Sequence, residues 1–596
     1  MTERQALDAA LQDLAGNAEQ LQAVTARTHC VVLAGPGSGK TKTLTTAMAR
    51  ALLEDVVEPR GAACVTYNNE CAIELEARLA ALGVEPGRRV FVGTVHSFAL
   101  AHVVSPYARC VATDLPETFR VASYAETRES VRAAYIKTIN SGENPNDRWR
   151  FAEQKRRQDV DRTTPSWLGK NPELARFIEA YEADLRIRGL IDFDDMPLIA
   201  YRIIRENPWV RDSLMAQFPI LFVDEYQDLG HALHQLVLEL CIRTGIRLFA
   251  VGDPDQSVYN FTGANPALLR DLAARDDVST IRLRFNYRCG SRIIDASMAA
   301  LGEERDYCTA DESTAQGSVV FRGIDGAASI QADYVAQAIV PSLVERGIPI
   351  DEIAVLYRTA AEGDQVAAAA IAAGLPIVRS DNRALIKRNS RVARWIESAA
   401  TWVVDGWRTA DPPFRRLWRQ ATTIVYGSDA SEEESSTLQR ELVVFLQGSI
   451  KDAHSTNIWL RELKAELIEP WQARARAFTN DWSVVDEMID RTDASSKDGD
   501  IPLSHFAGRI EGHGRLSLST FHSAKGREFD AVVLFGMDDD VFPSWREKTA
   551  DAILEARRLF YVGVTRSRRE VILVFRKNHH SPWVKELYDR VTAKDG

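Results

Sequence analysis

Long hydrophobic runs and closely spaced cysteine pairs are both missing from this sequence of 596 residues. No apolar run reaches the roughly 18 residues that a membrane-spanning helix needs. The seven cysteines are odd in number and scattered, without a Cys-x-x-Cys pair, which argues against a disulfide framework or a zinc site. Segment 1–16 is polar and acidic, so we expect no secretion signal and predict a cytoplasmic protein.

The sequence also has no excess of positive charge. It carries 84 Asp and Glu residues against 73 Lys and Arg residues, for a net charge of −11. A protein that coats nucleic acid without specificity is usually basic, so this class is disfavoured. A protein that holds nucleic acid in a locally basic cleft is not excluded, because the net charge of a protein constrains its association more than its function.

The length predicts about three to five domains. Short apolar runs bounded by polar or turn residues are typical of buried strands in a parallel α/β sheet. They occupy 30–34, 63–66, 220–223, 248–251, 353–356 and 531–535. Two charged, helix-patterned regions interrupt these segments, and we interpret both as insertions.

The first motif with clear chemistry is Ala34-Gly-Pro-Gly-Ser-Gly-Lys40-Thr41, which follows a predicted strand and precedes a helical pattern. It fits the loop that cradles phosphates, with alanine in place of the first glycine. Lys40 would reach the β- and γ-phosphate oxygens, and Thr41 would offer its hydroxyl to Mg²⁺. A chance match is the alternative, and the strand–loop–helix setting disfavours it. The predicted nucleotide contacts here are Ala34, Gly35, Gly37, Ser38, Gly39, Lys40 and Thr41.

Two carboxylates follow the predicted strand 220–223 directly. Asp224 would hold Mg²⁺, and Glu225 would orient or deprotonate the attacking water. An acidic helix cap at the end of a strand is the simpler alternative. The phosphate loop elsewhere in the chain favours the catalytic interpretation, with ATP and Mg²⁺ as ligands.

Further blocks follow in order along the chain, and together they resemble the superfamily 1A DNA helicases of the UvrD/Rep/PcrA family. After Asp224-Glu-Tyr-Gln-Asp228, the blocks similar to family motifs are Val251–Ala264, Phe285–Arg288, Leu518–Phe529 and Arg557–Arg566. Upstream, Asn17–Gln20, Val65–Asn69 and Gly93–His96 also match, as does Ile191–Asp195. The resemblance covers residues 14 to 577.

The resemblance implies roles around ATP. Gln256 would sense the γ-phosphate, Arg288 would touch it, and Arg566 would be the arginine finger. With Glu225, these three residues form the predicted catalytic set. Gln20 and Tyr287 would contact adenine, and Glu528 would lie near the ribose. For the arginines, a solvated surface role is the alternative.

The resemblance also implies contacts with single-stranded DNA, which aromatic faces can bind without sequence preference. The candidates are Tyr67, Asn69, Thr94, His96, Phe193, Tyr259, Phe261, Thr520 and His522. Each aromatic residue taken singly is also a candidate core residue.

Three positions depart from the family pattern. Thr262 stands where arginine is usual, Phe261 where tryptophan is frequent, and Glu70 where lysine is usual. Each change removes or shrinks a contact on the DNA side, whereas the ATP residues show no such loss.

We therefore predict an α/β fold with two RecA-like P-loop domains, each with a mainly helical insertion. Residues 1–96 and 196–280 would form the ATP-binding domain, with 97–195 as its insertion. Residues 281–384 and 506–596 would form the second domain, with 385–505 as a shortened insertion. ATP would lie at the interface of the two domains.

The predicted function is that of an ATP-dependent DNA helicase or single-stranded DNA translocase of 3′→5′ polarity, serving DNA repair, recombination or phage defence. Its partners would be single-stranded DNA, 3′-tailed duplex DNA and a nuclease or repair protein. A DNA-stimulated ATPase switch that gates such a protein without unwinding is the alternative. An RNA helicase is disfavoured by the DNA-directed resemblance of residues 224–228.

Overall fold

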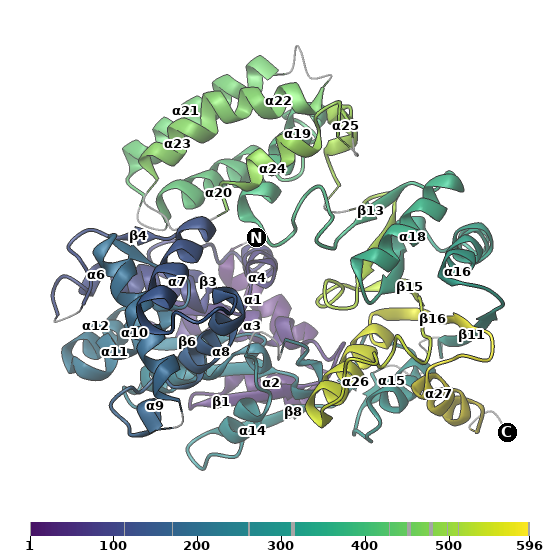
Figure 1. The fold of residues 1–596 in the computed structure, drawn as a ribbon, viewed down its shortest axis with the longest axis horizontal. Helices are drawn as coiled ribbons and strands as arrows, with labels where there is room; N and C mark the ends of the chain where they lie inside the picture. Colours follow the sequence, from purple (N-terminus) through teal and green to yellow (C-terminus); the bar gives the residue numbers. More distant parts are fainter. Residues whose placement is uncertain are drawn as a thin grey trace. The chain divides into compact units, whose positions relative to one another are not determined.

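A computed structural model describes residues 2–111, 114–169, 171–259, 263–310, 316–427, 430–449, 455–475, 481–496, 499–509 and 512–593. The chain divides into two compact units, which we describe separately (Figure 1). The first consists mainly of Met1–Leu33 and Lys40–Arg282. The second consists mainly of Leu283–Arg476 and Asp481–Gly596, and the short segment Ala34–Gly39 groups with it.

The first unit is built on a six-stranded sheet in the order β3-β2-β6-β7-β1-β8. Its strands are β1 Cys30–Ala34, β2 Ala62–Thr66, β3 Val90–Thr94, β6 Ile220–Val223, β7 Arg247–Gly252 and β8 Ser279–Leu283. The pairs β2–β3, β2–β6, β6–β7 and β1–β7 are parallel. Parallel pairing brings the carboxyl ends of these strands to one edge of the sheet, where ligands of open α/β sheets bind.

Helices complete the first unit around this sheet. They are α1 Glu3–Asp13, α2 Ala18–Thr25, α3 Lys40–Glu54, α4 Asn69–Ala81, α5 Val95–Phe98, α6 Ser105–Tyr107, α11 Asp195–Glu206, α12 Pro208–Gln217, α13 His231–Cys241 and α14 Ala267–Ala273. A π-helical segment, Ala99–Val104, lies between α5 and α6. Phe98, Val103 and Ile199 share one hydrophobic core with the strand residues Val31 and Val65. The segments just after β3 and just before α12 therefore pack as part of the sheet's own core.

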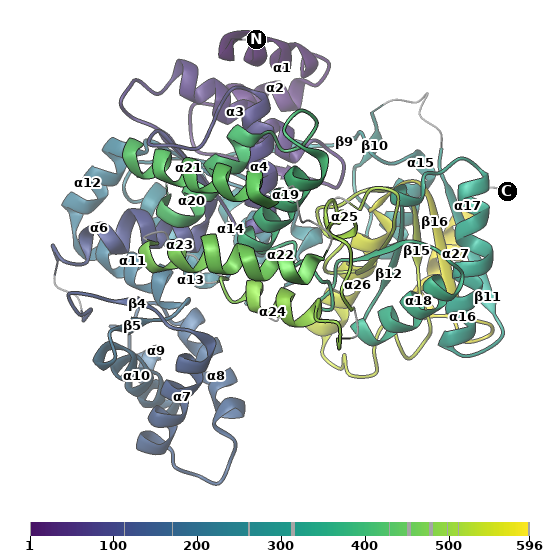
Figure 2. The same cartoon turned by 90° about the horizontal axis from the view of Figure 1, so that it is seen from above.

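In the sequence, a helical group with a hydrophobic core of its own lies between these two segments. It contains α7 Tyr124–Thr138, α8 Pro145–Gln158, α9 Ser166–Gly169 and α10 Pro172–Ile187, with the short strands β4 Arg120–Val121 and β5 Leu190–Ile191 (Figure 2). Trp167, Phe177 and Tyr181 are buried in this second core. Buried ion pairs of Arg156, a residue of α8, connect this group to Asp195 at the start of α11.

The second unit has a parallel sheet in the order β11-β16-β15-β12-β14-β13. Its strands are β11 Ser318–Ile324, β12 Ile353–Tyr357, β13 Ile377–Arg379, β14 Leu516–Thr520, β15 Phe529–Leu534 and β16 Ser567–Arg576. The strands β9 Phe285–Asn286 and β10 Cys308–Thr309 form a separate parallel pair. The surrounding helices are α15 Ser291–Leu301, α16 Ala328–Tyr334, α17 Val340–Glu345, α18 Ala360–Ala372, α26 Ala550–Val564 and α27 Pro582–Ala593.

The region between β13 and β14 is helical, and its helices lie together as a bundle (Figure 1). They are α19 Arg391–Asp405, α20 Phe414–Tyr426, α21 Glu432–Ser449, α22 Thr456–Leu463, α23 Glu469–Arg474, α24 Val484–Arg491 and α25 Leu503–Phe506. Trp395, Trp459 and Trp471 are buried in its core. Most of the tryptophans that mark this region in the sequence thus serve packing.

The predicted fold class is confirmed: the chain is α/β, with two parallel sheets and helical segments inserted into each. Every apolar run predicted as a strand is one, although β15 ends one residue earlier than the run 531–535. No helix in the described part of the chain combines the length and apolar character that crossing a membrane requires. The seven cysteines are all described, and none is in a disulfide.

Candidate nucleotide and DNA site

The phosphate-loop motif connects β1 to α3, as its sequence predicts. Gly37 and Gly39 have φ values of +69° and +79°, in the left-handed region that glycine adopts at no steric cost. Ser38 closes the loop on itself, because its Oγ donates to the carbonyl oxygen of Gly35 at 2.6 Å. Lys40 and Thr41 then begin α3, and the free N–H groups of a helix start are suited to phosphate.

Asp224 and Glu225 follow β6 at the carboxyl edge of the same sheet. Burial and the charge of Glu225 raise the pKa of Asp224 to about 7, although Lys40 opposes this shift. The Oδ1 atom of Asp224 is buried and has no hydrogen-bond partner. A buried carboxylate oxygen without a partner is costly, and a divalent cation would satisfy it.

Asp253 follows the neighbouring strand β7, and it resembles Asp224 in its burial, its raised pKa and its unpartnered carboxylate oxygen. It is fully buried, its Oδ2 atom has no partner, and burial raises its pKa to about 7 against the opposing charge of Lys40. Asp224 and Asp253 therefore provide buried oxygens of the kind that Mg²⁺ prefers, and the donor set fits that ion. Asp253 lies within the block Val251–Ala264, for which the family resemblance implied a role only at Gln256, Tyr259 and Phe261.

Glu225 has an unusual backbone conformation, with φ 51° and ψ 44° in the left-handed region. A non-glycine residue there costs about 1–3 kcal/mol and is found most often at functional sites. Its Oε2 atom lies 4.0 Å from Nζ of Lys40 and accepts a hydrogen bond from Nε2 of Gln227. The carboxylate is thus held near the lysine of the phosphate loop.

Two further predicted nucleotide residues of the first unit are buried near helix starts. Gln20 lies in the first turn of α2, where its N–H donates to Oδ1 of Asn17 at 2.9 Å. Gln256 ends a 3₁₀ turn, Pro254–Gln256, and its N–H donates to the carbonyl oxygen of Asp253 at 3.0 Å. The turn places Gln256 directly after the buried carboxylate of Asp253.

The second unit brings Arg288 and Glu528 together. Arg288 Nη2 donates to Glu528 Oε1 at 2.7 Å, and Nη1 donates to the carbonyl oxygen of Thr565 at 3.2 Å. Burial raises the pKa of Glu528, but the charge and hydrogen bond of Arg288 together with the charges of Arg566 and Arg568 outweigh burial, and the net shift is downward. Tyr287, beside Arg288, is 55% exposed.

Arg566 is only 2% exposed, which its predicted role does not suggest. Its guanidinium donates to the carbonyl oxygens of Val562 and Arg527 at 3.0 and 3.3 Å, and to Oγ1 of Thr565 at 3.2 Å. A solvated role at the surface, which was the alternative for the predicted arginines, is therefore wrong for Arg566.

Four predicted DNA residues form two stacked pairs in the first unit. The rings of Tyr67 and Tyr259 are 5.7 Å apart and 29° from parallel. Those of His96 and Phe193 are 3.9 Å apart and 23° from parallel. Burial lowers the pKa of His96 to about 4, so its ring is neutral at pH 7, and its buried Nδ1 has no partner. The aromatic residues quoted from four separate motifs thus meet in pairs.

The remaining DNA candidates lie at or shortly after the ends of strands. Thr94 ends β3 and caps α5, where its Oγ1 accepts from the N–H of Ser97 at 3.1 Å. Asn69 is the first residue of α4. Thr520 ends β14, and its Oγ1 accepts from the N–H of Ser523 at 3.1 Å, with His522 in the intervening turn. Both threonines thus stabilise local structure. Phe261 and Thr262 lie outside the described residues.

A buried ion network that sequence analysis missed holds the segment of Phe193. Arg156 is fully buried, and it contacts Glu182 at 2.7 Å and both Asp192 and Asp195 at 2.6 Å. The two aspartates lie on either side of Phe193 in the sequence, and Phe193 itself is 45% exposed. A buried cation with three carboxylates fixes geometry strongly, because removing one partner leaves an unpaired buried charge.

Replacing Phe193 by alanine is therefore expected to weaken binding of single-stranded DNA by about 1–3 kcal/mol, the value of one stacked base. Thermal stability should change little, because the ring is partly exposed and the backbone is held by Arg156. Phe151→Ala is the matched control, since this phenylalanine of α8 is 62% exposed and lies in no DNA motif. Equal losses of DNA affinity in both variants, measured by fluorescence anisotropy, would contradict a stacking role for Phe193.

Comparison with known proteins agrees with these features. The UvrD/REP helicase N-terminal domain model matches residues 16–276, and the UvrD-like helicase C-terminal domain model matches residues 506–578. The chain belongs to the UvrD/Rep helicase family. The family recognised from the sequence motifs is thereby confirmed.

Relatives match over nearly the whole chain. The ATP-dependent DNA helicase PcrA of Leuconostoc citreum is 25% identical over 639 residues, which is 97% of this chain and 83% of that protein. DNA helicase II of Escherichia coli K12 is 27% identical over 630 residues, 96% of this chain and 86% of that protein. ATP-dependent DNA helicase UvrD1 of Mycobacterium tuberculosis H37Rv is 26% identical over 650 residues, 95% of this chain and 83% of that protein.

Within the UvrD/Rep family pattern, the departure at Glu70 has a local physical reason. Glu70 lies in the first turn of α4, after the cap Asn68, whose Oδ1 accepts from the N–H of Cys71 at 2.9 Å. A negative charge is favourable at a helix start, where a lysine would be unfavourable. The substitution therefore stabilises the helix at the position where the family usually has a cation.

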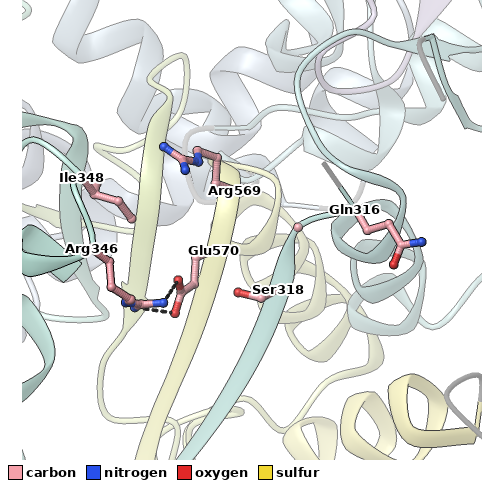
Figure 3. A pocket seen from close by; sticks show the side chains of 7 residues that line it. Gln316, Ser318, Arg346, Ile348, Arg569 and Glu570 are labelled. Atoms are coloured by element: carbon pink, nitrogen blue, oxygen red, sulfur yellow. Dashed lines mark hydrogen bonds and ion pairs between the residues drawn. The ribbon is translucent and has the colours of Figure 1, made fainter. Parts of the chain in front are cut away.

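A cavity of about 480 Å³ lies in the second unit, near the start of β16 (Figure 3). Ser318 at the start of β11 and Arg569 and Glu570 near the start of β16 line it, with Arg346 and Ile348. Arg346 donates to both oxygens of Glu570, at 2.8 and 3.0 Å. The cavity thus lies at the amino ends of these two strands and contains none of the predicted site residues.

Proposed function

We propose that this protein is an ATP-dependent DNA helicase that moves 3′→5′ along single-stranded DNA and displaces the complementary strand. One observation carries the proposal: the phosphate loop, the buried carboxylates of Asp224 and Asp253, and the aromatic residues Tyr67 and His96 all follow parallel strands at the carboxyl edge of the first sheet. Tyr67 and His96 each stack on a further predicted DNA residue, Tyr259 and Phe193. Nucleotide chemistry and base stacking are therefore built on the same edge of one sheet. The family and its helicase-named relatives support this function.

The chain's residues divide the chemistry of ATP hydrolysis. The loop amides and Lys40 would bind the phosphates, and Glu225 would orient the attacking water and receive its proton. Thr41 and Asp224 would hold Mg²⁺, which neutralises phosphate charge when bound. Gln256 would sense the γ-phosphate.

The second unit would supply Arg288 and Arg566 for the charge that develops on the phosphoryl group, Glu528 for the ribose and Tyr287 for the adenine. Hydrolysis then requires residues of both units. ATP binding would favour one conformation of the chain and hydrolysis would release it, because loss of the γ-phosphate would remove the contacts proposed for Gln256, Arg288 and Arg566. Repeated on a bound strand, this change would move the protein along DNA.

Strand displacement on 3′-tailed, 5′-tailed and blunt duplexes, with ATP hydrolysis measured in the same reactions, tests the proposal. We expect displacement of the 3′-tailed duplex only. Displacement from 5′ tails alone would contradict the polarity. Hydrolysis without displacement would favour the alternative, an ATPase switch that gates a partner nuclease or repair protein.

We also expect ATP hydrolysis to be slow without nucleic acid and strongly stimulated by single-stranded DNA. The stimulation should fall as salt rises, because phosphate contacts weaken with ionic strength. A titration with single-stranded DNA, duplex DNA and single-stranded RNA at two salt concentrations measures this. Equal stimulation by all three would contradict a motor specific for single-stranded DNA.

A further inference from the structure

One fully buried side chain, that of Gln227, joins the ends of two neighbouring strands. Its Nε2 donates to Oε2 of Glu225, just after β6. Its Oε1 accepts from the backbone N–H of Asp253, just after β7, at 2.9 Å. The same amide group is therefore a donor toward one strand end and an acceptor toward the other.

The surroundings of Gln227 leave this side chain little freedom. A Cβ atom added to Gly252 would lie 2.6 Å from Oε1 of Gln227, so the close approach depends on glycine at that position. Oγ of Ser257 donates to the carbonyl oxygen of Gln227 at 3.2 Å. Because only an amide offers a donor and an acceptor in this geometry, neither leucine nor ionised glutamate can make both contacts.

The two ends that Gln227 joins carry different tasks in the proposed reaction. Glu225, in its left-handed backbone conformation, is the residue proposed to orient water. The carbonyl oxygen of Asp253 accepts the N–H of Gln256, the proposed γ-phosphate sensor, at 3.0 Å. Three hydrogen bonds thus link Glu225 to Gln227, Gln227 to the N–H of Asp253, and the carbonyl oxygen of Asp253 to Gln256.

We propose that Gln227 is a positioning residue that couples the water-orienting carboxylate of Glu225 to the segment that senses the γ-phosphate. Movement of Gln256 on binding the triphosphate would pass through Asp253 and Gln227 to Glu225, which orients water only when the sensor is engaged. This inference rests on the proposed function, because it assumes that Glu225 acts on water. Gln227 itself touches no reacting atom.

Two substitutions in the full-length chain separate the two contacts. Gln227→Leu removes both hydrogen bonds and keeps the side-chain volume. Gln227→Glu keeps the acceptor for Asp253 but sets a second carboxylate against Glu225. We expect both variants to lower kcat of DNA-stimulated ATP hydrolysis by about 10- to 100-fold, as loss of an orienting partner typically does, with little change in KM.

A double-mutant cycle with Glu225→Gln tests whether the effect passes through Glu225. We expect Gln227→Leu to cost nothing further in kcat when position 225 already carries glutamine. Gln331→Leu is the matched control, since Gln331 is also fully buried and donates to Asp538 at 3.4 Å, far from the motif segments in sequence. Its melting temperature should fall while its kcat stays at the wild-type value.

Three results would overturn the inference. One is a wild-type kcat in Gln227→Glu, which would leave only the contact with Asp253 as relevant. Another is a loss in Gln227→Leu that adds fully to that of Glu225→Gln. The third is a loss of kcat that Gln331→Leu reproduces at equal change in melting temperature. A wild-type protein without DNA-stimulated hydrolysis would instead refute the proposed function, and the positioning role with it.

Discussion

Replacing Glu225 by glutamine is expected to slow ATP hydrolysis by about 10²- to 10⁴-fold, the contribution typical of a general base, without weakening ATP binding. The charge of Glu225 helps to raise the pKa of Asp224, so a neutral amide removes repulsion beside the proposed metal ligand. Affinity for nucleotide should therefore hold or increase. Single-turnover hydrolysis and equilibrium binding of a fluorescent ATP analogue measure the two quantities separately.

Lys40→Ala gives the complementary result. It should abolish hydrolysis and also weaken ATP binding strongly, because the lysine neutralises phosphate charge in the ground state as well as in the transition state. Nζ of Lys40 lies 4.0 Å from Oε2 of Glu225, so the two substitutions change neighbouring groups. Lys40→Ala removes a charge that binds ATP, whereas Glu225→Gln removes only the group that acts on water. A Glu225→Gln variant that hydrolyses ATP at the wild-type rate would exclude this residue as the catalytic carboxylate.

Site residues that belong to one continuous segment, directly after a predicted strand, could be predicted from the sequence. The loop Gly35–Thr41 and the pair Asp224 and Glu225 follow apolar runs, and strand, loop and helix occupy the predicted places. The reason is local: a short buried strand fixes where its carboxyl end lies, and the next residues must face that edge.

Contacts between distant segments could not be predicted in the same way. Nothing in the block that contains Gln227 indicates that its amide spans two strand ends, because that contact depends on the pairing of β6 with β7. The same holds for Arg156, which meets Glu182, Asp192 and Asp195 only after α8, α10 and the start of α11 pack together. Each of these residues reads as an ordinary charged or polar residue in the sequence.

The second inserted region is rich in tryptophan, and the sequence does not say what these residues do. In the structure, Trp395, Trp459 and Trp471 are buried in the core of a helical bundle. A small bundle that cannot share the core of the neighbouring sheet needs large apolar side chains of its own, and an aromatic residue supplies the most buried area. Composition alone therefore does not distinguish a binding surface from a core.

Arg566→Ala is expected to have the largest effect, with a loss of about 10³- to 10⁵-fold in kcat at nearly unchanged ATP affinity. Arginine stabilises charge that develops as the γ-phosphoryl group leaves, so the ground state gains little from it. Arg566 nevertheless differs from an exposed finger, because it is buried and donates to Val562, Arg527 and Thr565. Alanine would also remove these three hydrogen bonds, and a lower melting temperature is expected.

A second variant separates catalysis from stability. Arg566→Lys keeps one positive charge but loses the planar fork, so we expect kcat to stay far below the wild-type value while the melting temperature recovers in part. Arg569→Ala is the control, since this arginine of β16 is exposed and lies 3.5 Å from Asp530. If Arg566→Lys hydrolysed ATP at the wild-type rate, charge alone would suffice and the fork geometry would be irrelevant. If Arg566→Ala did so while folded, Arg566 would have only the structural role that its three buried contacts already show.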